Sequence, residues 1–210
     1  MSRLPHMAKR RYEQRERAEA AERTRRRILD SVIEHLRTSP GEPLSVEGIA
    51  EKAAVARSTV YAIFGSRSGL FDAVAADVLE GDAYDRLLEA KFEPDAREHL
   101  RVGFVHGTEM LARDRDVVRA LFSMAPLDPD GVGAAVRRRE ESRARGMKRV
   151  ARRLREQDLL APGVSAADAE HTLWLLTSFE AFDLLHTGRD LSPAVAARLL
   201  TETAERALLK

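Results

Sequence analysis

Two short helical segments separated by a tight turn constrain this chain more than any other feature. In the first, Ser45–Ala53, apolar residues recur at i, i+3, i+4 and i+7 from Val46 onward, which places them on one helical face. The Ser45 hydroxyl can accept hydrogen bonds from the N–H groups of the first turn. The second segment, Ala56–Phe64, keeps its polar residues at its start and turns Val60 and Phe64 the other way. This arrangement predicts a helix-turn-helix.

The start of the second segment supplies groups suited to DNA. Arg57 can reach a guanine edge or a phosphate, and the short side chains of Ser58 and Thr59 let the backbone approach phosphate. Tyr61 offers a flat apolar body with a hydroxyl at its tip. Gly65 ends the segment, and the next helix begins with N–H groups that can bind phosphate. We therefore expect the start of this second helix to meet DNA.

Residues 55–70, VARSTVYAIFGSRSGL, resemble the recognition-helix signature of the tetracycline-repressor (TetR) family of transcription regulators. The Thr-Val-Tyr triplet, the Phe three residues later, the Ser two beyond it and the closing Leu fall in register. Ala54 stands where the family often has glycine, Ile63 where His or Tyr is common, and Arg67 where Lys is usual. The resemblance implies a DNA-binding regulator in which Arg67 keeps the positive charge for phosphate.

The formal net charge of +1 hides a basic N-terminal region. Residues 1–27 hold ten basic residues against four glutamates, so we expect an arm that binds phosphate. Residues 1–7, MSRLPHM, are set aside from the fold prediction. The predicted DNA contacts are Arg25, Arg26, Ser45, Val46, Arg57, Ser58, Thr59, Tyr61 and Arg67.

Every clear segment has helical periodicity, and none shows the alternation of a strand, so the predicted fold class is all-α. We expect a basic arm over 1–23, a helix-turn-helix DNA-binding domain over 24–67, and a larger helical ligand-binding and dimerisation domain over 68–210. Cysteine is absent, which excludes disulfides and thiolate metal sites. No apolar run reaches the length of a membrane span or a signal-peptide core, and we expect a cytoplasmic protein.

The larger domain divides at its prolines and glycines. A helix from Ser68 to about Ala90 has a predicted interruption near Gly81, and the last two helices are expected at about 165–188 and 193–209. These last two are apolar on more than one face, so they either wrap a core or meet a partner. The resemblance implies the second: a four-helix bundle in a homodimer, and therefore a near-palindromic DNA operator.

The segment from Arg137 to Arg155 is rich in arginine and has few acidic residues. Three interpretations stay open. In the first, the helix presents a solvated face, and the long aliphatic parts of its arginine side chains lie over its neighbours. In the second, it docks an anionic ligand or an acidic partner. In the third, it forms a second nucleic-acid surface.

The sequence lacks the motifs of catalysis. There is no HExxH or other metal-ligand spacing, no Gly-rich phosphate loop and no GxSxG, so we predict no catalytic residue, no metal and no cofactor. An apolar cavity with a few polar groups would suit a small lipophilic effector, by analogy with the family. The predicted effector contacts are Phe104, His106, Thr108, Met110, Phe122, His171, Trp174 and Phe179.

These observations favour a DNA-binding repressor that a small lipophilic molecule releases from its operator. Two alternatives remain. One is a DNA-binding regulator controlled by a protein partner. The other is a helical enzyme or scaffold that does not bind DNA.

Overall fold

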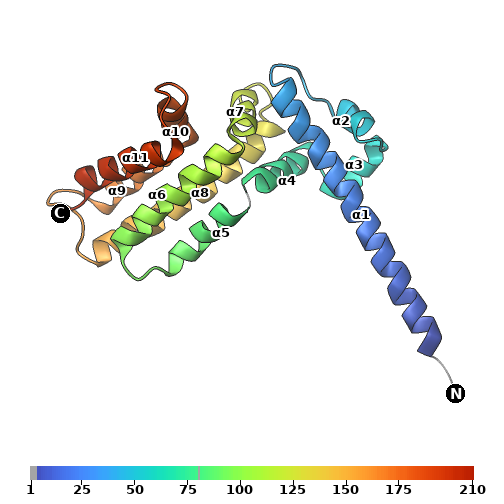
Figure 1. Cartoon of the computed structure of the whole chain (residues 1–210), viewed down its shortest axis with the longest axis horizontal. Helices are drawn as coiled ribbons and strands as arrows, with labels where there is room; N and C mark the ends of the chain where they lie inside the picture. The colour runs from blue at the N-terminus through green and yellow to red at the C-terminus, as the bar shows by residue number, and fades with distance from the viewer. Residues whose placement is uncertain (1–3, 80) are drawn as a thin grey trace.

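The computed structural model describes residues 4–79 and 81–210, with side chains from residue 14 onward, and in these ranges the chain is helices joined by loops (Figure 1). The predicted all-α fold is confirmed. The first four helices are α1 (Leu4–Thr38), α2 (Val46–Lys52), α3 (Arg57–Phe64) and α4 (Arg67–Leu79). They are followed by α5 (Asp82–Glu89), the 3-10 turn η1 (Ala90–Phe92), α6 (Ala96–Arg113), α7 (Arg115–Met124), α8 (Val132–Glu156), α9 (Ala166–Leu176), α10 (Phe179–His186) and α11 (Pro193–Leu208).

The N-terminal helix α1 is one continuous helix of 35 residues. Its second half packs against α2, α4 and α7, with Ile28, Leu29 and Leu36 fully enclosed. Its first half projects beyond the rest of the molecule (Figure 1). The boundary predicted between residues 23 and 24 corresponds to no break in α1, because no proline or glycine interrupts it there.

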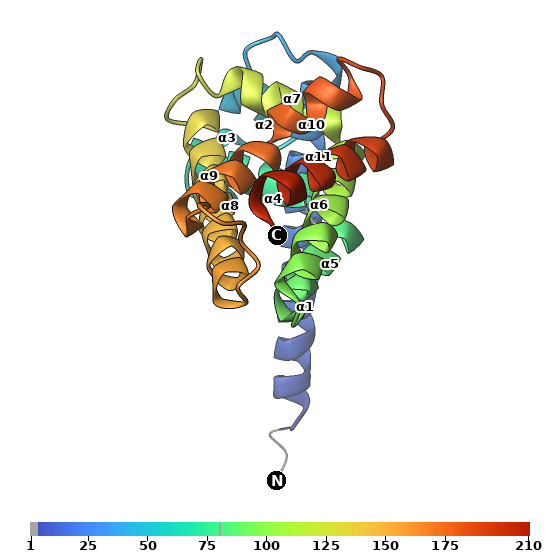
Figure 2. The ribbon, with the colours of Figure 1, turned by 90° about the vertical axis from the view of Figure 1, so that its left-hand side faces the viewer.

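Two hydrophobic cores hold the molecule together. The first joins α1–α4 to α7, the start of α8 and α10, so the N-terminal helices share one core with part of the larger domain. The second lies between α6, α8, α9 and α11 around Phe104, Leu154 and Leu173. Figure 2 shows α11 lying crosswise to α6, against which it packs. A displacement of α7 or α10 would therefore disturb the packing of the helices that carry the helix-turn-helix.

The predicted interruption near Gly81 is confirmed: α4 ends at Leu79 and α5 begins at Asp82. Gly81 has a φ of 137°, a conformation that L side chains rarely adopt. A Cβ atom there would lie 2.1 Å from Nη1 of Arg113. Glycine at this position therefore serves both the turn and the close approach of an arginine from α6.

The single helix predicted over 165–188 is wrong, because the structure has two helices there, α9 and α10. Ser178 caps the second one: its Oγ accepts a hydrogen bond of 3.1 Å from the Ala181 N–H. The Thr177 hydroxyl donates to the Leu173 carbonyl at 2.7 Å and helps to close the first. The break lets Phe179 and Phe182 enter the first core. In the part of the chain that the structure describes, no helix is long and apolar enough to cross a membrane.

Candidate DNA-binding site

The helix-turn-helix is built as its sequence predicts. The Ser45 Oγ accepts the Gly48 N–H at 3.0 Å and caps α2, while Val46, Ile49 and Ala50 are buried beneath it. In the turn, Ala54 has a φ of 52°, a left-handed conformation that explains why the related family often has glycine here. The turn brings the first turns of α2 and α3 onto one exposed surface.

That surface presents most of the side chains predicted to contact DNA. On α3, Arg57, Ser58 and Tyr61 are exposed, Thr59 is half-buried, and Val60 is buried in the core. The polar side chains therefore leave α3 on its outer face, as base reading requires.

Arg57 does not extend freely into solvent. Its Nη1 lies 2.8 Å from Oε1 of Glu47 on α2, and its Nη2 donates to the Tyr61 hydroxyl at 3.4 Å. The guanidinium carbon lies 5.4 Å from the centre of the Tyr61 ring. The hydrogen bond to Tyr61 and the charge of Glu47 raise the pKa of Arg57 above its usual value, so the guanidinium stays charged.

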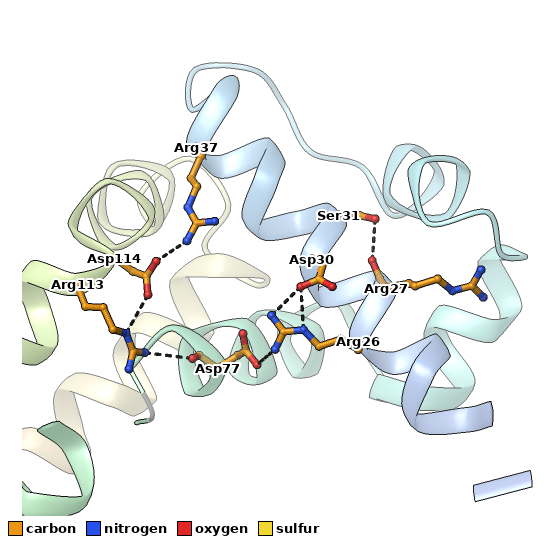
Figure 3. Close-up of polar contacts among 8 residues, drawn as sticks. All are labelled: Arg26, Arg27, Asp30, Ser31, Arg37, Asp77, Arg113 and Asp114. Atoms are coloured by element: carbon orange, nitrogen blue, oxygen red, sulfur yellow. Dashed lines mark hydrogen bonds and ion pairs between the residues drawn. The ribbon is translucent and has the colours of Figure 1, made fainter. Parts of the chain in front are cut away.

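Two neighbouring arginines of α1 have different surroundings. The Arg25 guanidinium carbon lies 5.6 Å from the centre of the Phe64 ring, at the end of α3. Arg26 instead binds Asp30 at 2.6 Å and Asp77 of α4 at 2.5 Å, and the hydrogen bond to Asp30 leads the contacts that raise its pKa (Figure 3). The predicted contact of Arg26 with DNA stays a prediction, and it would require Arg26 to exchange one of these two carboxylates for a phosphate.

Two further residues predicted to contact DNA have packing partners within the protein. The Arg67 Nε donates to Oδ2 of Asp128 at 2.9 Å, and its guanidinium lies over the Phe71 ring. Asp128 stands 61 residues away in the sequence, so local pattern could not reveal it. The Val46 side chain is only 5% exposed, because it belongs to the apolar stripe of α2. A contact of Val46 with DNA is left to its backbone N–H.

The residues predicted to contact an effector are not gathered in one place. Phe122 and Phe179 touch, with ring centres 5.3 Å apart, and Phe104 and Thr108 are buried on α6. Met110 packs against the first core, as Phe122 and Phe179 do, whereas Phe104 belongs to the second core. His106 binds Glu109 at 2.8 Å, and His171 and Trp174 are exposed on α9.

Some arginines of the arginine-rich helix α8 are paired with other groups of the same molecule. Arg138 makes a bidentate ion pair with Asp72 of α4, at 3.0 and 2.6 Å. Arg143 binds Glu140 and the Trp174 carbonyl. Seven basic residues of α8 are exposed: Arg137, Arg138, Arg145, Lys148, Arg149, Arg152 and Arg155. Among them, Arg152 also pairs with Glu156 at 3.5 Å.

A ring of polar contacts joins α1, α4 and the end of α6 (Figure 3). Arg113 donates to the Val78 carbonyl at the end of α4 and to Asp114 at 3.1 Å, and Asp114 in turn binds Arg37 of α1. The bond from Arg26 to Asp77 closes the ring. Hollows of about 590 and 630 Å³ flank the Arg37–Asp114–Arg113 bridge, and both are lined mainly by charged side chains.

Comparisons with known proteins agree with this geometry. Residues 34–74 match the model of the bacterial regulatory proteins of the tetR family. The native NalD of Pseudomonas aeruginosa, the secondary repressor of the MexAB-OprM multidrug efflux pump, is similar in structure: the TM-score is 0.71 at 20% identity, over 91% of this chain and 98% of that one.

Two further structures are similar over most of both chains. A putative fatty acid metabolism regulator of Clostridium perfringens has a TM-score of 0.65 at 20% identity, covering 88% of this chain and 99% of that one. A putative transcriptional regulator of Saccharomonospora viridis, solved in complex with choline, has a TM-score of 0.63 at 20% identity, covering 90% and 99%. No curated protein sequence matches the chain significantly.

The fold and the exposed start of α3 are those of a helix-turn-helix DNA-binding protein. Residues 34–74 match the model of the tetR family of bacterial regulatory proteins, and the whole chain has the fold of structures that include a putative TetR-family regulator from Rhodococcus.

Proposed function

We propose that this protein is a homodimeric repressor that binds a near-palindromic operator and that a small lipophilic molecule releases. The observation that carries the proposal is the outer face of α3, where Arg57, Ser58 and Tyr61 stand exposed on a helix whose other side is locked into the core. A helix held in this way can enter the major groove without losing its packing.

Exposed apolar side chains on α9 and α10 support the dimer. Trp174, Leu175 and Leu184 are 42, 60 and 70% exposed. Large exposed apolar side chains are typical of protein–protein interfaces. A two-fold axis through these side chains would present two α3 helices to one side of the DNA, about 34–36 Å apart for half-sites one helical turn apart.

The interior of the larger domain supports an apolar effector. Phe122 and Phe179 lie where α7 meets α10, and α7 shares a core with α1 and α4. A lipophilic molecule that separates these two rings would move α7 against the helices that position α3. Such a molecule would bind better to the form in which the two α3 helices are wrongly spaced, and so would shift the population off DNA.

The proposal is tested by selecting a duplex from a random-sequence pool and measuring its binding against random competitor at two salt concentrations. A dimer that prefers a near-palindromic sequence is the expected result. Medium-chain fatty acids, a steroid and choline are then titrated into the complex. Equal binding to random DNA would overturn the DNA-reading function, and an operator affinity unchanged by each bound compound would overturn the release.

A further inference from the structure

The first turn of α2 and the first turn of α3 meet in a cluster of three exposed side chains. Glu47 contributes a carboxylate, Arg57 a guanidinium and Tyr61 a ring with a hydroxyl. Glu47 and Arg57 are 59 and 58% exposed, so the ion pair between them lies on the outer surface and is not a core contact. The cluster holds Arg57 back along α3, over the ring one turn further on.

The carboxylate changes the electrostatics of this surface. An unpaired arginine at the start of a recognition helix would bind any nearby phosphate, which adds affinity for all sequences alike. With Glu47 2.8 Å away, the pair carries no net charge, and a phosphate that approaches Arg57 also meets a negative group. The pair is thereby biased away from phosphates and towards groups that satisfy both of its members.

A G·C base pair offers such groups in the major groove. Guanine presents O6 and N7, which accept the two N–H groups of an arginine, and cytosine presents an N4 amino group, which donates to a carboxylate. Within the described residues, Glu47 meets Arg57 through Oε1, and its Oε2 is left to accept such a bond.

We propose that Glu47 is a specificity-determining residue: it withdraws Arg57 from phosphates and, together with Arg57, selects a G·C pair in the operator. The inference rests on the proposed operator binding. Because exposed ion pairs contribute little to stability, the Glu47–Arg57 contact can rearrange at the base edges at small cost. The Tyr61 ring keeps the guanidinium ordered while it does so, which lowers the entropy lost on binding.

The test uses the full-length protein and the duplex that the wild type selects. Arg57→Ala first identifies the base pair that Arg57 reads, as the position where substitution no longer matters. Replacing that G·C pair by A·T should weaken wild-type binding about tenfold and should weaken Glu47→Gln binding much less. For Glu47→Gln on random DNA, we expect tighter binding and a dependence of log K on log salt steeper by about 0.9, as Arg57 takes up a phosphate.

Glu51→Gln is the matched control, since Glu51 is exposed on the same helix one turn away and forms no recorded ion pair within the described residues. It should keep the tenfold discrimination. Thermal unfolding of both variants checks that the fold is intact. Equal effects of the two variants, or full discrimination in Glu47→Gln, would overturn the role of Glu47 while leaving operator binding in place. A wild type without sequence preference would overturn the proposed function itself.

Discussion

Arg25 and Arg26 are neighbours in sequence with the same charge, and the fold gives them different partners. Arg25 leans over Phe64 at the end of α3, whereas Arg26 is neutralised by Asp30 and Asp77. We therefore expect Arg25, the side chain that touches α3, to be the one that meets the DNA backbone. The other braces α1 against α4.

We therefore expect Arg25→Ala to impair DNA binding and Arg26→Ala to impair stability. Arg25→Ala should weaken binding to all sequences alike and reduce the salt slope by about 1, since one phosphate contact is lost. Arg26→Ala should leave the slope unchanged and lower the melting temperature, because Asp77 loses its partner. Salt titrations and thermal unfolding of both variants check this. A reduced slope in Arg26→Ala would show that Arg26 leaves Asp77 for the DNA.

Asp128 joins three segments of the chain through one carboxylate. It accepts the Gly131 and Val132 N–H groups at 3.1 and 3.2 Å, at the start of α8, and the Arg67 Nε at the start of α4. Burial acts to raise the pKa of Asp128, but the hydrogen bonds from Arg67 and the backbone outweigh it and hold that pKa below its usual value. Glycine at position 131 leaves space for the Arg67–Asp128 contact, because a Cβ atom there would lie 2.8 Å from Arg67 Nε.

Asp128→Asn should lower the free energy of unfolding by about 1–3 kcal/mol at pH 7, since charge-assisted hydrogen bonds are lost. A carboxyl with a lowered folded-state pKa stabilises the protein above its ordinary pKa of about 3.9, and this stabilisation is lost as the pH falls through the lower value. The difference between wild type and variant should therefore shrink below about pH 4. Chemical unfolding at several pH values measures it. Asp130→Asn, exposed two residues further on, should show neither effect.

At the residue scale, the sequence predicts those roles that depend on near neighbours. The cap at Ser45 is found as expected, because its hydroxyl accepts the Gly48 N–H, three residues ahead, at 3.0 Å. The partner of Arg67 could not be predicted, because the Arg67–Asp128 pair exists only once α4 and the α7–α8 loop have packed together.

At the scale of elements, the break between α9 and α10 likewise could not be predicted from the local sequence. Glycine marks the end of α3 at Gly65 and the break near Gly81, and both were predicted. The break between Leu176 and Phe179 has neither residue, and the cap at Ser178 becomes favourable because it lets Phe179 and Phe182 reach the first core. Tertiary packing therefore outweighs the local preference for one long helix.

The exposed apolar residues of these two helices give the prediction for the dimer. Leu184→Arg should convert the dimer to a monomer, because the proposed interface would bury a charge without a partner. Operator affinity should fall steeply while the helix content is kept. Analytical ultracentrifugation and circular dichroism measure both. Leu127→Arg is the control, since Leu127 is 84% exposed in the α7–α8 loop. A Leu184→Arg dimer would place the interface elsewhere.

For the whole molecule, the feature that matters most is the junction between the N-terminal helices and the larger domain. The ring formed by Arg26, Asp77, Arg113, Asp114 and Arg37 spans α1, α4 and the α6–α7 corner (Figure 3). We expect it to fix the angle at which α1 leaves the larger domain, and through that angle the spacing of the two α3 helices in the proposed dimer.

Gly81→Ala should loosen this junction. The new Cβ atom would meet Arg113, and the φ of 137° would be strained, so we expect a loss of at least about 1 kcal/mol in the free energy of unfolding. Weaker operator binding should accompany it. Gly103→Ala is the control: a Cβ there has nothing within 4 Å, and Gly103 lies inside α6, so alanine should stabilise by about 0.5–1 kcal/mol. Equal unfolding curves for the two variants would contradict the role of Gly81.

The bond from Arg113 to the end of α4 bears on how regulators of this kind can be recombined. A protein engineer who grafts residues 1–79 onto another effector domain would leave behind Arg113, Asp114 and Asp128, which supply the partners of Val78, Arg37 and Arg67. The transplanted unit would keep its DNA-reading surface but lose the contacts that orient it against the larger domain. A working chimera would have to carry the α6–α7 corner and the loop before α8 along with it.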